Sequence, residues 1–142
     1  MKVKIKKLHP DAIIPKYAKD GDAAMDLFAV SRNPVMGQSQ LKYGTGLAFE
    51  IPEGHVGLIY PRSSITKMAI RLANCTGVID SGYRGEVSFI FDVPHPNNGE
   101  YYKVGDRIGQ IMIVPYPKIE FDEVEELSET SRGIGGFGST GS

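Results

Sequence analysis

Gly85-Glu-Val-Ser-Phe-Ile-Phe-Asp-Val93 carries the clearest two-residue pattern in this chain. Val87, Phe89 and Phe91 recur at every second position, so an extended backbone places all three on one face. The same period recurs in residues 2–8, 39–51 and 55–60, and helical periodicity is nearly absent. The sequence therefore predicts an all-β fold.

The rest of the chain fits many short strands joined by turns. Residues 107–114 are almost continuously apolar, which predicts a strand buried on both faces. In residues 119–127 apolar and polar side chains also alternate, but less regularly. A short helix is expected at about residues 64–71, with Ser64 as its N-cap. Turns are predicted at 52–54 and 94–99. Short strands in one domain favour a closed β-sandwich or barrel, which hides its edges.

Length and composition limit the class of protein. The chain has 142 residues, which we divide into a β-barrel domain at 1–127 and a flexible tail at 128–142. Its net charge is −1, with 16 basic and 17 acidic residues, so no nucleic-acid partner is expected. Cys75 is the one cysteine, and the sequence has no long apolar run. We therefore expect a cytoplasmic protein without a membrane partner.

The C-terminal stretch 132–142 reads Arg-Gly-Ile-Gly-Gly-Phe-Gly-Ser-Thr-Gly-Ser. Glycine allows successive backbone N–H groups to approach an anion, and the hydroxyl and guanidinium groups add donors for phosphate oxygens. Phe137 offers a flat ring on which a base can stack. The stretch predicts a clamp for a nucleotide polyphosphate. The alternative is a disordered Gly/Ser tail.

A second candidate is Asp80, which follows the apolar pair Val78-Ile79 and precedes Ser81-Gly82. A carboxylate at the junction of a strand and a turn is well placed to take a proton from an attacking water. The alternative is an aspartate whose side chain caps the turn.

Five stretches occur in a fixed order: residues 23–29, 61–64, 77–87, 105–110 and 132–142. This set resembles the trimeric deoxyuridine triphosphatase (dUTP diphosphatase, dUTPase) family. The resemblance implies a jelly-roll β-barrel that assembles as a homotrimer. It also implies hydrolysis of dUTP to dUMP and pyrophosphate, which limits uracil in DNA and supplies dUMP for dTMP synthesis. In that family each active site takes the tail of one subunit and motifs from two others.

The resemblance also implies roles for single residues. Asp80 matches the catalytic aspartate, and Tyr83 matches the tyrosine that excludes a ribose 2′-hydroxyl. Uracil would be bound by the backbone of residues 77–83, with Gly77, Val78 and Ile79 at its start and Asn74 nearby. Asn74 has a plain turn role as its alternative. Phosphate contacts are expected from Arg62, Ser63, Gln110, Arg132, Gly136, Gly138 and Ser139, and Phe137 is expected to stack on the base.

Two residues have a structural alternative to phosphate binding. Arg62 could pair with Asp26, a pairing that is largely structural in the family. Gln110, in an apolar strand, needs a hydrogen-bond partner in any case. The expected cofactor is Mg²⁺ carried by the triphosphate and its waters, with no direct protein ligand and with Gln110 contributing at most through water.

One departure from the family pattern keeps other functions open. Gly82 stands where the family has a second aspartate, and the related dCTP deaminase family often has glycine or a small residue there. A deaminase would need a catalytic glutamate at the position of Ile90, which cannot transfer a proton. A non-catalytic, nucleotide-gated binding module is a further alternative.

Overall fold

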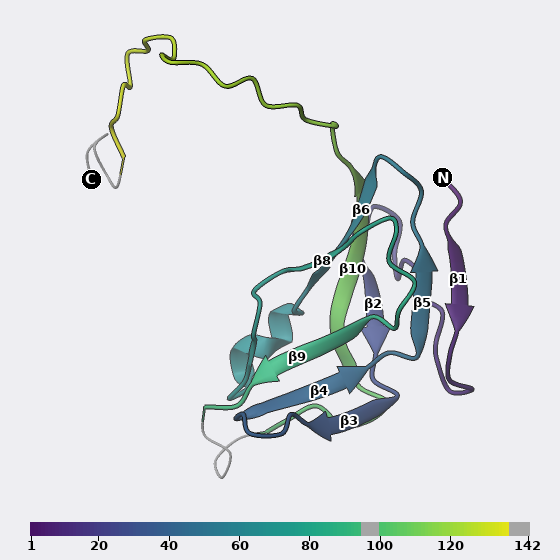
Figure 1. Cartoon of the computed structure of the whole chain (residues 1–142). Helices are drawn as coiled ribbons and strands as arrows, with labels where there is room; N and C mark the ends of the chain where they lie inside the picture. The colour runs from purple at the N-terminus through teal and green to yellow at the C-terminus, as the bar shows by residue number, and fades with distance from the viewer. Residues whose placement is uncertain (95–99, 137–142) are drawn as a thin grey trace.

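The computed structural model describes residues 1–94 and 100–136 and is almost entirely β-structure (Figure 1). Its one helical segment within that part is the 3₁₀ helix η1, Ser63–Lys67. The strands are β1 Lys4–Lys7, β2 Met25–Phe28, β3 Ser31–Pro34, β4 Gln40–Gly44, β5 Leu47–Glu50, β6 His55–Tyr60, β7 Arg71–Leu72, β8 Gly77–Ile79, β9 Ser88–Asp92 and β10 Arg107–Pro115. The predicted all-β class is confirmed.

Two four-stranded antiparallel sheets enclose the core. One has the order β2, β10, β6, β8, and the other has the order β3, β4, β9, β7. A two-stranded sheet of β1 and β5 lies beside them (Figure 1). Val87, Phe89 and Phe91 are buried as predicted, and Tyr43 packs edge-on against Phe91 with the ring centroids 5.6 Å apart. Burial of these aromatic side chains supplies much of the hydrophobic stabilisation.

The central strand β10 carries site residues between its core positions. It pairs with β2 on one side and with β6 on the other. Phe89 packs so closely on the α-carbon of Gly109 that a Cβ there would collide with the ring and lie 2.9 Å from the Tyr60 carbonyl oxygen. Glycine at position 109 therefore allows β10 to lie close to Phe89 on β9 of the other sheet. The neighbouring Gln110 side chain points to the opposite face of β10.

Strand β10 is not buried on both faces, so the prediction of burial on both faces was wrong for the single chain. Ile108, Gly109 and Ile111 are buried, whereas Met112 and Val114 are half-buried. The second face is the outer face of its sheet, and no other described strand or helix of the chain is paired or stacked over it.

Three predicted elements differ in the structure. Residues 39–51 form two strands, because Gly46 adopts a φ of 65° between them and redirects the chain. Residues 119–127 form no strand, and Phe121 is 93% exposed. In Figure 1 the chain after β10 runs away from the barrel, so this alternating segment has no neighbouring strand to pair with. The domain boundary at 127 stays a prediction.

The predicted helix at 64–71 was wrong in type and extent. The chain makes a 3₁₀ helix at Ser63–Lys67 and returns to strand at Arg71–Leu72. Arg62, not Ser64, occupies the cap position, and no side-chain hydrogen bond caps the helix. The turn at 52–54 is confirmed by a hydrogen bond from His55 N–H to the Pro52 carbonyl at 3.2 Å. Of the other predicted turn, residues 95–99 lie outside the described residues.

No helix in the described ranges 1–94 and 100–136 is long and apolar enough to span a membrane.

Candidate functional site

An ion-pair network joins three strands at one end of the barrel. Asp26 on β2 lies opposite Gln110 on β10, and Gln110 lies opposite Tyr60 at the end of β6. The Asp26 carboxylate accepts hydrogen bonds from Arg62 Nε at 2.8 Å and from Arg107 Nη1 at 3.2 Å. Arg62 therefore pairs with Asp26, one of the two partners considered from the sequence. One carboxylate holds two guanidinium groups side by side, which leaves a local excess of positive charge.

Sequence reasoning missed Arg107. Arg107 lies in the motif at residues 105–110, three residues before Gln110. Its place in that motif is the feature of the sequence that could have marked it as a site residue. Its pairing with Asp26, 81 residues away, depends on the register of β10 with β2.

The Gln110 side chain binds the backbone of the segment that carries Arg62. Its Nε2 donates to the Pro61 carbonyl at 2.9 Å, which satisfies the predicted need for a partner. Its Oε1 makes no hydrogen bond with any residue in 1–94 or 100–136 and is left to accept one from a ligand or water. Gln110 and Tyr60 line a cavity of about 470 Å³ together with Arg62, Arg107 and Lys19.

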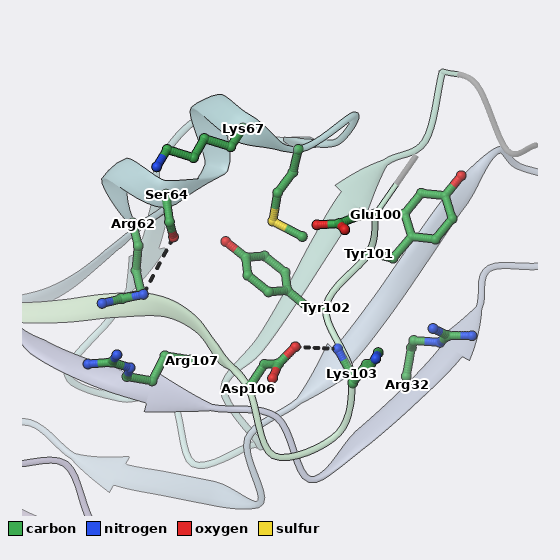
Figure 2. Close-up of a pocket in the computed structure, with 11 residues that line it drawn as sticks. Arg32, Arg62, Ser64, Lys67, Glu100, Tyr101, Tyr102, Lys103, Asp106 and Arg107 are labelled. Atoms are coloured by element: carbon green, nitrogen blue, oxygen red, sulfur yellow. Dashed lines mark hydrogen bonds between the residues drawn. The ribbon is translucent and has the colours of Figure 1, made fainter. Parts of the chain in front are cut away.

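A second cavity has a volume of about 740 Å³ (Figure 2). Arg62 and Arg107 line both cavities. The cationic groups exceed the carboxylates around this second cavity, where Arg32, Arg62, Lys67, Lys103 and Arg107 face Glu100 and Asp106. Together the two cavities form a positively charged region suited to a polyanion.

Tyr102 forms part of the wall of the second cavity and is 5% exposed. Burial raises the pKa of its hydroxyl, and the nearby Ser64 hydroxyl and Arg62 charge oppose that rise. Figure 2 shows this hydroxyl below η1, where Arg62 Nη1 lies 3.4 Å from Ser64 Oγ. Ser63, the predicted phosphate contact, is exposed at the start of η1, and its carbonyl accepts from Thr66 Oγ1 at 2.9 Å.

Asp80 stands at the first position of a tight turn directly after β8. The turn is closed by Tyr83 N–H donating to the Asp80 carbonyl at 3.0 Å. The Asp80 side chain is exposed, and its carboxylate makes no hydrogen bond within the described part of the chain. The backbone therefore closes this turn, without the side-chain cap that was the structural alternative. The carboxylate is left available for chemistry.

The Tyr83 side chain is fixed by contacts with the residues that follow it. Its hydroxyl donates to the Glu86 carbonyl at 3.1 Å, and its ring covers the α-carbon of Gly85 so closely that a Cβ there would collide with it. The ring does not pack across paired strands, and its side chain is 45% exposed. A fixed, accessible ring is what the predicted contact with a sugar requires.

The strand β8 has a free edge near Asn74. It pairs with β6 on one side and with no other strand among the described residues. Gly77 packs against Ile59, while Val78 is 62% exposed. Backbone donors and acceptors along that edge are open to a ligand, as base recognition would need. Asn74 is exposed, and its carbonyl accepts from Thr76 N–H at 2.5 Å.

The two halves of the predicted site lie at opposite ends of β6. Ile79 pairs with Gly57, so Asp80 follows the strand toward Val56, whereas Arg62 lies beyond Tyr60. Val56 and Arg62 are six positions apart in the chain, which corresponds to about 20 Å of extended backbone. A single chain therefore brings Arg62, Asp26 and Gln110 together but does not bring Asp80 to them.

The tail also stands apart from both halves in Figure 1. Arg132 Nε donates to the Gly135 carbonyl at 3.0 Å, a bond within the tail, and Gly136 is exposed. Phe137, Gly138 and Ser139 lie outside the described residues.

Comparisons with known proteins agree on one family. The dUTPase family model matches residues 10–141. The chain is 44% identical over 142 residues to the deoxyuridine 5′-triphosphate nucleotidohydrolase of Nautilia profundicola, covering 99% of each protein. The dUTPase of Staphylococcus bacteriophage 80alpha with dUPNHPP superposes with a TM-score of 0.84 at 30% identity, covering 99% of both chains. A mutant dUTPase from phage phi11 of S. aureus, described with a structural Mg(II) ion, gives a TM-score of 0.74 at 25% identity, covering 89% of this chain and 98% of that one.

Proposed function

The chain belongs to the dUTPase family and hydrolyses dUTP, and we propose that Asp80 is its general base. The reaction yields dUMP and pyrophosphate, which limits uracil in DNA and supplies dUMP for dTMP synthesis. The observation that carries the assignment of the base is the Asp80 carboxylate itself, which is exposed on a closed turn and free of hydrogen bonds within residues 1–94 and 100–136.

In the proposed step Asp80 takes a proton from a water that attacks the α-phosphorus. A new bond forms between the water oxygen and phosphorus, and the bond from that phosphorus to the oxygen bridging to the β-phosphate breaks. Pyrophosphate leaves with the bonding electrons on that oxygen. General-base assistance of this kind is worth about 10²–10⁴-fold in rate.

The phosphates would be held by the group of residues at the other end of β6. Arg62 and Arg107 supply positive charge that the single Asp26 carboxylate does not cancel. Ser63 is exposed at the start of η1 to donate its hydroxyl, and Gln110 is fixed by Pro61 beside them. The tail residues Arg132, Gly136, Phe137, Gly138 and Ser139 would close over the nucleotide, with the Phe137 ring stacking on the base.

The residues present fit a Mg²⁺ ion bound mainly by the substrate. The described residues contain no group of three or more metal-ligating His, Cys, Asp or Glu side chains, and both Asp26 oxygens are taken by arginines. Mg²⁺ keeps several waters and needs few protein ligands, and when bound it would neutralise charge on the triphosphate. The free Oε1 of Gln110 is placed to accept a hydrogen bond from such a water.

Selection for deoxyuridine would come from the β8 end. The open edge of β8 offers backbone groups at Gly77, Val78 and Ile79 to uracil, with Asn74 adjacent. The Tyr83 ring, pinned by Glu86, would exclude a 2′-hydroxyl by volume. A base with the opposite donor and acceptor pattern would leave buried groups unpaired, which is a strong basis for rejection.

We propose a homotrimer with shared active sites. The distance between Asp80 and Arg62 in one chain is the first support. The second is the outer face of the β2-β10-β6-β8 sheet, where the apolar Val56, Leu58, Met112 and Val114 are only half-buried. A cytoplasmic location is also proposed, supported by Cys75 being a free thiol.

A nucleotide panel tests the proposed function. We expect ³¹P NMR to show dUMP and pyrophosphate from dUTP in the presence of Mg²⁺, little product without Mg²⁺, and intact UTP, dCTP and dTTP. Conversion of dCTP to dUTP with dUTP left intact would assign the chain to the deaminases. Tight binding of dUTP with no product would show a binding module.

Gly82 is open to substitution by the aspartate of the family pattern. No heavy atom lies within 4 Å of an ideal Cβ at Gly82, and its φ lies outside the left-handed region. We expect Gly82→Asp to change kcat by less than about 10-fold and the free energy of unfolding by about 1 kcal/mol in either direction. Steady-state kinetics and urea unfolding measure both. A hundredfold gain in kcat would instead identify the chain as a catalytically impaired relative.

A further inference from the structure

The turn that carries Asp80 has almost no packing of its own. Asp80, Gly82, Tyr83 and Arg84 are all exposed, and β-sheet pairing ends at Ile79. The space beside Gly82 is empty. The turn is closed by the backbone hydrogen bond from Tyr83 N–H to the Asp80 carbonyl, and the Tyr83 side chain is held by its hydroxyl, which donates to the Glu86 carbonyl.

Arg84 supplies further restraints from outside the turn. Its Nη1 donates to the Ser81 carbonyl at 2.6 Å and to the Tyr83 carbonyl at 2.9 Å. These two carbonyls flank Gly82, the most freely rotating residue of the turn. Because one nitrogen binds both oxygens, the Ser81–Gly82 and Tyr83–Arg84 peptide planes are held relative to each other, with Gly82 and Tyr83 between them.

The Arg84 side chain also lies near an acidic side chain of the barrel. Arg84, Ser81 and Gly82 share a surface cavity with Lys4 and Glu50, which belong to β1 and β5. The pKa of Glu50 is lowered first by its hydrogen bond and charge contact with Lys4, and to a smaller extent by the charge of Arg84. Arg84 therefore has an anionic neighbour on the paired strands β1 and β5 while it holds the turn.

We propose that Arg84 is a positioning residue for catalysis, which holds the Asp80 turn in its reactive geometry by binding the Ser81 and Tyr83 carbonyls. In this role Arg84 acts through the backbone of the turn, by way of the Ser81 and Tyr83 carbonyls. The inference rests on the proposed role of Asp80 as general base. It also explains how a turn with glycine at position 82 keeps its shape without a side chain there.

The test is Arg84→Met, which keeps the length of the side chain and removes its donors. Displacing a catalytic group by about 1 Å costs up to about 10²-fold in rate, so we expect kcat to fall between about 10-fold and 100-fold. The KM for dUTP should stay within about threefold, and the melting temperature within about 5 °C, because the side chain is exposed. Amide hydrogen exchange at Tyr83 should become faster in the variant.

Two companion variants separate positioning from a general effect of losing an arginine. Arg84→Lys keeps a cation with several donors and should recover part of the lost kcat. Arg71→Met is the matched control: Arg71 is 78% exposed and donates to Asp92 at 3.0 Å on the other sheet. Its loss should leave kcat and the exchange of Tyr83 unchanged.

The outcomes distinguish this inference from the proposed function. Unchanged kcat and unchanged Tyr83 exchange in Arg84→Met would overturn the inference, while an inactive Asp80→Asn would leave the general base in place. Normal turnover in Asp80→Asn would overturn the general base. A loss of kcat in Arg84→Met accompanied by an equal loss in Arg71→Met would also count against positioning.

Discussion

Replacement of Asp80 by asparagine should lower the turnover of dUTP by about 100-fold or more and leave nucleotide binding intact. Asparagine has nearly the size of aspartate but cannot accept a proton from the attacking water. The Asp80 carboxylate makes no hydrogen bond within the described residues, so its loss breaks no described contact in the fold. The melting temperature should therefore stay close to that of the unchanged protein.

Pyrophosphate release measures the loss of turnover, and calorimetric titration with the analogue dUpNHpp measures binding. Asp11→Asn is a suitable control, since Asp11 is an exposed carboxylate on the loop after β1, 3.8 Å from His9. Its removal should leave kcat unchanged. Turnover near the normal rate in Asp80→Asn would remove Asp80 from the mechanism.

Deletion of residues 131–142 should leave a folded, assembled protein with dUTP hydrolysis lowered by about 100-fold or more, since positioned phosphate donors are worth that much. Within residues 1–94 and 100–136, the last strand ends at Pro115 and every buried core residue precedes that point. The deletion removes the expected phosphate donors and the Phe137 ring together and takes no described residue from the core. Circular dichroism, size-exclusion chromatography and kcat report on fold, assembly and activity.

Single substitutions refine this test. Phe137→Ala should reproduce part of the loss, because it removes the ring that stacks on the base. Ile134→Ala is the matched control, as Ile134 is an apolar side chain of the same tail with 106% relative exposure. A truncated protein that hydrolyses dUTP at the normal rate would show the tail to be a plain Gly/Ser extension.

The fold was predictable where the two-residue pattern reflects a buried face. Residues 55–60 form a strand with the predicted bounds, and Val87, Phe89 and Phe91 form part of the core. The pattern failed at residues 119–127, since alternation indicates only a capacity to pair and no neighbouring strand is present in the described part of the chain. It also failed at η1, where one short turn of helix lacks the length that periodicity needs.

For the candidate site, the sequence predicted residues from the family motifs but not their geometry, and their roles stay predictions. The family motifs pointed to Asp80, Arg62 and Gln110, and the structure gives Arg62 the Asp26 partner that was anticipated. Local sequence does not encode which carbonyls a guanidinium binds or which strands lie opposite each other. Arg107 and Arg84 were therefore missed, although both lie inside the quoted motifs.

The placement of Asp80 and Arg62 at opposite ends of β6 has a genetic consequence. With the shared active sites proposed above, a protomer defective at one end still lends its intact end to a neighbour. Two different inactive alleles, one changed at Asp80 and one at Arg62, would then complement each other in mixed assemblies. Two alleles changed at the same end would not, because every site would lack the same group.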